Sequence, residues 1–167
     1  QQIATVKAAR HHGIPTLVLL RSPNEAIPSR VVRKSVGINR EQEKVICRAL
    51  KEYQDFYSYV ASCDGIDIVR FETVVNAPRS FVEFVLRNIG LKVPEEFEIE
   101  PICRFARDSV EYWEEKHMSH DALTENFSNE KKEAKKAQVR GRIEQRYPEM
   151  HGRVESLYSN LARGAQL

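Results

Sequence analysis

Cysteine is scarce in this sequence, and its few cysteines are not spaced to hold a metal ion. Cys47, Cys63 and Cys103 show no CxxC spacing and no paired histidine pattern, so we expect no zinc site. An odd number of cysteines without a disulfide framework fits a reducing compartment or buried thiols. His117 and His120 stand three residues apart, as metal ligands can, but no carboxylate pattern joins them and we expect no metal.

The sequence also lacks a long apolar run and a strong net charge. No run approaches the roughly 18 apolar residues that span a bilayer, and residues 1–10 do not resemble a signal peptide. We therefore expect no membrane segment in this chain and a cytoplasmic location, with a Golgi-type anchor upstream of Gln1 as the alternative. Because 26 basic residues nearly balance 24 acidic ones, we expect no nucleic-acid partner, and any anion site must be local.

The composition is that of one folded domain. Of its residues, 41% are hydrophobic and 30% are charged, which is typical of globular chains. A chain of 167 residues is too short to expect two domains. We therefore expect residues 1–167 to form a single domain.

The first part of the sequence predicts a helix, a strand and a second helix. Apolar residues at helical spacing precede Gly13, which is placed to end the first helix. Residues 14–20 are apolar without alternation, as in a central strand of a parallel sheet that is buried on both faces. Ser22 and Glu25 match a capping box, and Pro23 falls at the first helical position. Within this second helix, Pro28 removes a backbone hydrogen bond and predicts a kink.

The remainder predicts mostly helices. Over residues 43–63 apolar residues recur at spacings of three and four residues, which predicts a long amphipathic helix. Residues 66–70 predict a second short strand, and a further helix is expected from about Asn76 to Gly90. Residues 94–101 fit a loop or a short strand. A basic helix is expected over residues 131–142 and a last helix over residues 150–163, whose buried side chains would be Val154, Leu157, Tyr158 and Leu161.

These elements predict an α/β fold in which a parallel sheet is flanked by helices and the carboxyl-terminal part is rich in helix. Both strands have the composition of interior strands, yet two parallel strands alone rarely form a stable sheet. We therefore expect further strands to come from residues upstream of Gln1 or from a partner chain.

The turn after the first strand is the best candidate for a binding site. Ligands of open parallel sheets lie beyond the carboxyl ends of the strands, and Arg21 stands at such an end, just before a helix. Unpaired backbone N–H groups and the helix dipole favour an anion there. The Arg21 guanidinium can hold two phosphate oxygens at once, and Ser29, two turns into the helix, could reach the same anion.

This segment resembles the 3′-phosphate-binding segment of sulfotransferases that use 3′-phosphoadenylyl sulfate (PAPS). The likeness rests on Leu-Arg-x-Pro at residues 20–23 and on Ser29, eight residues beyond Arg21. Residues 68–74 with Pro78, the helix and Gly-Leu of residues 81–91, and the tail from residue 128 onward are similar to later parts of the same family, in the same order.

The resemblance implies a P-loop-NTPase-like sheet, PAPS as co-substrate, adenosine 3′,5′-bisphosphate (PAP) as product and no metal. It implies that Arg21 and Ser29 hold the 3′-phosphate. Further candidates for nucleotide binding are Ser22, Phe71, which stands where many members have Tyr, and the pair Lys131 and Lys132.

Two features of the family are absent from this sequence. The Lys-Ser/Thr-Gly-type loop for the 5′-phosphosulfate is not found, and neither is the histidine that serves as general base. We expect the catalytic residues upstream of Gln1, together with the missing amino-terminal strand and phosphate loop. The implied function is transfer of a sulfuryl group from PAPS to a hydroxyl or amine of a small-molecule, carbohydrate or lipid acceptor, this chain supplying the 3′-phosphate-binding half. The alternative is a non-catalytic phosphonucleotide-binding or scaffold domain.

Simpler interpretations remain open for each candidate. Arg21 could pair with Glu25 at the surface, and Ser29 could be an ordinary helix serine. The basic run at residues 131–142 could be a solvated helix face. His11 and His12 fit a connecting loop, because they precede the strand whose far end carries Arg21. Tyr112 and Trp113 fit a core better than an acceptor pocket.

Overall fold

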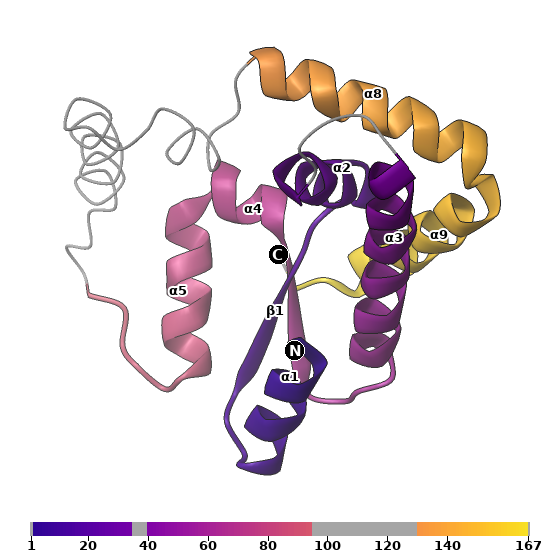
Figure 1. The fold of residues 1–167 in the computed structure, drawn as a ribbon. Coiled ribbons are helices and arrows are strands. Elements are labelled where there is room, and N and C mark those ends of the chain that lie inside the picture. The colour runs from indigo at the N-terminus through magenta and orange to yellow at the C-terminus, as the bar shows by residue number, and fades with distance from the viewer. Residues whose placement is uncertain (1, 35–39, 95–129, 167) are drawn as a thin grey trace, which may run out of the picture.

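The structure is a computed structural model that describes residues 2–34, 40–94 and 130–166. No helix in that part of the chain is both long and apolar enough to cross a membrane. Figure 1 shows the elements, which follow one another as α1 (Gln2–His11), β1 (Thr16–Leu20), α2 (Pro23–Lys34), α3 (Arg40–Ala61), β2 (Ile66–Arg70), α4 (Phe71–Asn76), α5 (Pro78–Asn88), α8 (Glu130–Arg146) and α9 (Pro148–Gly164).

The fold is mixed α/β, with a small parallel sheet flanked by helices. β1 and β2 pair in parallel, in a register that runs from Thr16 opposite Ile66 to Leu20 opposite Arg70. Helices α2 and α3 make the crossover between the two strands, and α9 packs against both. Just beyond α9, the Gln166 N–H donates a hydrogen bond of 2.9 Å to the Ile68 carbonyl of β2. The two predicted strands and their parallel pairing are therefore confirmed.

The first strand is less enclosed than the sequence predicted. Val18 and Leu20 are buried, but Leu19 between them is 39% exposed and Ile14 is 55% exposed. Within the described residues, each strand pairs with only one neighbour. The prediction of a strand buried on both faces is wrong here: on the face opposite Val18 and Leu20, Leu17 is half-buried and Leu19 is exposed.

Most predicted helix ends are correct to within a few residues. Gly13, with a φ of 64°, follows the end of α1, and its N–H bonds to the Arg10 carbonyl at 3.0 Å. Asn76, expected to begin a helix, instead ends the short helix α4, and a new helix starts at Pro78. Proline disfavours the helical region for the residue before it, and Ala77 has a φ of −137°, so the chain breaks between the two helices.

The core lies where α2, α3, α8 and α9 meet the inner face of β1. The α3 side chains supply its centre, as the predicted amphipathic helix requires. Val154 and Leu161 of α9 are buried as predicted, whereas Leu157 and Tyr158 are half-buried. The buried members are Val18, Leu20, Ile27, Val31, Ile46, Ala49, Leu50, Tyr53, Tyr57, Val60, Val139, Ile143, Val154 and Leu161.

Several predictions concern residues whose structure is not described here. Residues 94–101 lie almost entirely outside the described residues, as do Cys103, Tyr112, Trp113 and the pair His117 and His120. Cys47 is exposed and Cys63 is half-buried, so neither is the fully buried thiol that the sequence allowed.

Leu50 tests the position of the core. Its side chain is completely buried in α3, so Leu50→Ala removes packed methyl groups and leaves a cavity. We expect the free energy of unfolding to fall by about 2–5 kcal/mol, measured by urea titration. The control is Val75→Ala on α4, where the side chain is 61% exposed; its effect should stay within about 0.5 kcal/mol. Equal effects of the two substitutions would contradict this core.

Candidate functional site

The turn between β1 and α2 begins the helix as predicted, but without the predicted capping box. Pro23 is the first residue of α2. The Ser22 carbonyl accepts the N–H groups of Glu25 and Ala26 at 3.0 and 2.8 Å. The Glu25 carboxylate turns toward α8, where Arg140 donates to it at 3.1 Å. The side chain that was expected to cap α2 therefore joins two helices instead.

Arg21 and Ser29 line the same pocket. This cavity of about 260 Å³ lies between α2 and α3, and Gln2 of α1 also contributes to it. Helix α2 continues through Pro28 to Lys34, and Ser29 sits on its pocket-lining face. The structure thus brings together the two residues that the sequence motif singled out.

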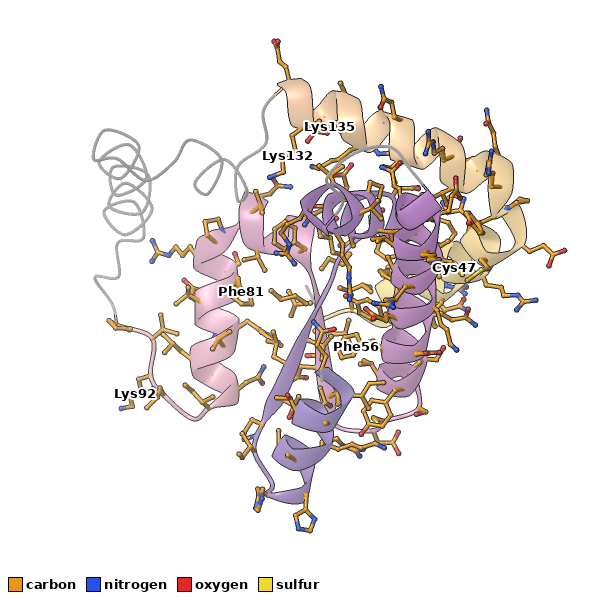
Figure 2. All side chains as sticks on the ribbon, in the orientation of Figure 1. Cys47, Phe56, Phe81, Lys92, Lys132 and Lys135 are labelled. Atoms are coloured by element: carbon orange, nitrogen blue, oxygen red, sulfur yellow. The ribbon has the colours of Figure 1, made fainter. Side chains whose placement is uncertain are left out.

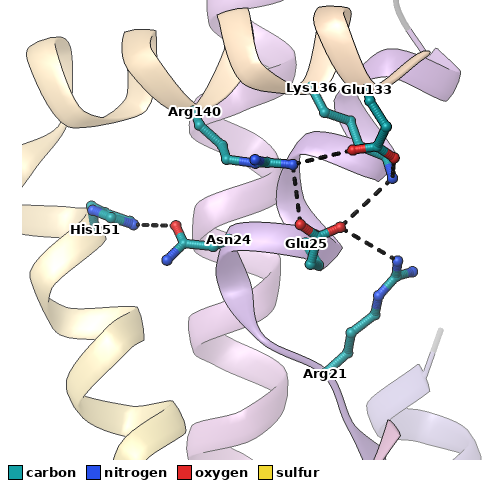
Figure 3. A network of polar contacts seen from close by, with 7 residues as sticks. All are labelled: Arg21, Asn24, Glu25, Glu133, Lys136, Arg140 and His151. Carbon is teal, nitrogen blue, oxygen red and sulfur yellow. Dashed lines mark hydrogen bonds and ion pairs between the residues drawn. The ribbon is translucent and has the colours of Figure 1, made fainter. Parts of the chain in front are cut away.

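Phe71 holds the Arg21 side chain from one side and Glu25 holds it from another. The Arg21 guanidinium carbon lies 4.9 Å from the centroid of the Phe71 ring, which is a cation–π contact. Its Nη2 is 4.0 Å from Glu25 Oε2, at the limit of an ion pair, and the Arg21 side chain stays 34% exposed. Figure 3 shows the approach of Arg21 to Glu25. The simple pairing with Glu25 therefore exists, but it leaves the guanidinium accessible to a ligand in the pocket.

Two tyrosines of α3 fix the backbone at the carboxyl end of β1. The Tyr53 hydroxyl donates to the Arg21 carbonyl and the Tyr57 hydroxyl to the Leu19 carbonyl, both at 2.8 Å. Burial raises the pKa of both hydroxyls above the ordinary tyrosine range, so both stay protonated and remain donors near neutral pH. Both rings also line the pocket. Their positions in the sequence indicated only the buried face of a helix, and nothing local showed that they reach β1.

The pocket carries more positive than negative charge. Three arginines line it, Arg21, Arg30 and Arg33, and the only acidic residue among its described lining residues is Glu52. Arg30 forms an ion pair with Glu52. A concave site with guanidinium groups and a hydroxyl is suited to an anion that carries several oxygens.

The other sequence candidates are not part of this pocket. Ser22 is half-buried beside it but does not line it. Lys132 is half-buried near the start of α8, where Figure 2 labels it, and it does not line the pocket either. Lys131 belongs to α8, and its side chain is outside the part of the chain that the structure describes. His11 is the last residue of α1, and His12 lies in the connection between α1 and β1.

The basic face of α8 is partly buried against α2. The side chain of Lys136 is only 6% exposed, and its Nζ lies 2.7 Å from Glu133 Oε1 and 3.6 Å from Glu25 Oε2. Arg140 donates to Glu25 at 3.1 Å and to Glu133 at 3.4 Å, and Figure 3 draws these contacts. The interpretation of this run as a solvated face is therefore wrong for Lys136, which is buried. Arg140 is half-buried, and it pairs with Glu25 of α2, which is far away in the sequence.

A second polar contact joins α2 to α9. His151 Nε2 is 3.0 Å from Asn24 Oδ1, as Figure 3 also shows. Together with the Glu25 contacts, it fixes the first turn of α2, which follows directly after Arg21. The candidate site is therefore supported by helices that lie at the other end of the sequence.

Neither a metal cluster nor a similar protein identifies the site further. The described residues contain no group of three or more His, Cys, Asp or Glu side chains that could hold a metal ion. No protein-family model, curated protein or solved structure matches this chain.

Glu25→Gln tests the ionic support of the site. The substitution removes the charge that faces Lys136 and Arg140, and Lys136 stays buried, so we expect a loss of about 1–3 kcal/mol in the free energy of unfolding. A double-mutant cycle with Lys136→Met should give a coupling of about 0.5–3 kcal/mol. Glu83→Gln is the control, because its partners Arg79 and Arg87 are 58% and 73% exposed, and it should cost less than about 1 kcal/mol. Additive effects of Glu25 and Lys136 would contradict the network.

Tyr57 should make the stability of the fold decrease at alkaline pH. Burial raises the pKa of its hydroxyl in the folded chain, whereas the unfolded chain releases the proton near pH 10, roughly. As pH rises above about 10, the unfolded state loses a proton that the folded state keeps, so stability falls. The free-energy difference between wild type and Tyr57→Phe should therefore shrink between about pH 9 and 11, in urea titrations at each pH. A constant difference would show that Tyr57 titrates alike in both states.

Proposed function

We propose that the pocket beside α2 binds the 3′-phosphate of PAPS, and that the chain supplies the 3′-phosphate-binding half of a PAPS-dependent sulfotransferase. One observation carries the proposal. Arg21 and Ser29, the two residues of the sequence motif, line a single pocket although eight residues separate them. The acceptor would be a hydroxyl or an amine on a small molecule, a carbohydrate or a lipid.

The charge and shape of the pocket support this ligand. A 3′-phosphate is a monoester with a second pKa of about 6, so it is largely dianionic near neutral pH. Arg21 offers a planar pair of donors to two of its oxygens, and the Ser29 hydroxyl can donate to the third. The contact with Phe71 and the accessible, long ion pair to Glu25 keep the guanidinium oriented without occupying all of its donors.

In the proposed reaction Arg21 and Ser29 bind and orient the donor. The bond between sulfur and the 5′-phosphate oxygen breaks, a bond from sulfur to the acceptor oxygen or nitrogen forms, and the acceptor proton must be removed. Holding the nucleotide at its 3′-phosphate aligns the leaving oxygen and the acceptor, which is worth several powers of ten in rate for well-oriented reactants. We assign no described residue to the removal of the proton or to the leaving phosphate.

Arg21→Ala should weaken the binding of PAP far more than the binding of AMP, which has no 3′-phosphate. A charge-assisted contact of this kind contributes about 1.5–3 kcal/mol, which corresponds to a loss of roughly ten- to a hundredfold in affinity. Isothermal titration calorimetry with both nucleotides measures it. Arg48→Ala on α3, an exposed arginine that does not line the pocket, is the matched control.

Two outcomes would argue against the proposal. Equal losses for PAP and AMP would mean that Arg21 does not contact the 3′-phosphate, and an effect of Arg48→Ala as large as that of Arg21→Ala would indicate nonspecific attraction. If the protein binds PAP but transfers no label from PAPS to any acceptor class, the non-catalytic nucleotide-binding alternative is favoured.

A further inference from the structure

The pocket that contains Arg21 extends along α2. A second hollow of about 470 Å³ lies between α1, α2 and α3. It shares Gln2, Arg30, Arg33, Glu52 and Phe56 with the first pocket. Arg21 belongs only to the first hollow, at the start of α2, whereas Arg33 borders both. The two hollows therefore form one groove along α2, with Arg21 in the first hollow and Arg33 where the two hollows meet.

Ser29 and Arg33 lie on the same face of α2. Ala26, Ser29, Arg30 and Arg33 line the first pocket, and their spacing of three and four residues places them in one stripe of a helix. Ser29 and Arg33 are one turn apart, a rise of about 6 Å. Side chains on a helix lean toward its amino terminus, so the Arg33 side chain leans back over the turn that carries Ser29.

Arg33 is the arginine of this groove that has no acidic partner among residues 2–34, 40–94 and 130–166. Arg21 pairs with Glu25 and stacks on Phe71, and Arg30 pairs with Glu52. No ion pair engages Arg33 within those ranges, and its side chain is exposed to the groove. Its positive charge is therefore available to a ligand without displacing a carboxylate.

We infer that Arg33 is a second contact to the 3′-phosphate and determines specificity for a phosphomonoester dianion. This inference rests on the proposed binding of PAPS at Arg21 and Ser29. A guanidinium group on each side of Ser29 supplies two positive charges, which match the two negative charges of a monoester. A phosphodiester or a sulfate ester carries a single negative charge, so it gains less from the second arginine. Arg33 acts on binding and takes no part in bond making.

The pairing of Arg30 with Glu52 favours Arg33, rather than Arg30, as the second contact to the phosphate. An anion that bound Arg30 would have to separate it from Glu52 and would lie close to that carboxylate. The repulsion between like charges opposes this. Arg33 carries a guanidinium group one turn further along α2. Asp55 also lines the second hollow, but it forms no ion pair with Arg33.

The test compares Arg33→Gln with Arg48→Gln, a matched loss of one charge on the exposed side of α3. Calorimetric titrations use PAP and its 3′-methyl ester, in which the 3′-phosphate is a diester with one charge. We expect Arg33→Gln to weaken PAP binding at least tenfold, roughly one charge-assisted contact, and to weaken the methyl ester by less than about threefold. Arg48→Gln should change neither, and Arg33→Lys should restore part of the PAP affinity.

The pH dependence gives a second readout. Binding of PAP to the wild type should weaken as pH falls through about 6, because the monoester gains a proton, and this dependence should be smaller in Arg33→Gln. If Arg33→Gln matches Arg48→Gln while Arg21→Ala still weakens PAP, the role of Arg33 is overturned and the proposed function stands. If Arg33→Gln weakened the binding of PAP and of its methyl ester equally, Arg33 would not recognise the second negative charge of the 3′-phosphate. If the wild type shows no saturable PAP binding, the proposed function fails, and this inference fails with it.

Discussion

Lys136 is an almost completely buried cation, and the structure depends on the carboxylates that form ion pairs with it. Burying an unpaired ammonium group costs several kcal/mol, roughly, so α8 can pack on α2 only where Glu25 and Glu133 face this side chain. Both do, at 3.6 and 2.7 Å. The position of α8 and the orientation of the first turn of α2 therefore follow from one buried charge.

That same arrangement determines how tightly Arg21 is held. The Glu25 carboxylate already faces Lys136 and Arg140, so its negative charge is largely balanced before Arg21 approaches to 4.0 Å. A carboxylate with two closer cations attracts a third one weakly. Arg21 is thus oriented by Glu25 and by the Phe71 ring, yet it remains available to an anion in the pocket.

The sequence predicted what depends on neighbouring residues. The two strands, the start of α2 at Pro23, the end of α1 before Gly13 and the burial of Val154 all follow from periodicity or turn chemistry. Contacts across the chain could not be predicted in this way. Arg140 and Glu25 are separated by 115 residues, and no local pattern reveals that pair. The motif placed Arg21 just before α2 and Ser29 within it, as the structure has them. The pocket also needs α1 and the tyrosines of α3, whose spacing shows only that they face a core.

The separation of Glu25 from Arg140 also has a consequence for synthesis. A ribosome makes the chain from the amino end, so β1, α2 and α3 emerge well before α8, which starts only at Glu130. During that interval the Glu25 carboxylate faces water, and the apolar surface that α8 and α9 later cover is open to solvent. Contacts between residues so far apart form slowly because a long loop must close first. The nascent protein therefore exposes its future core until most of the chain has been made, which is when a chaperone would bind it.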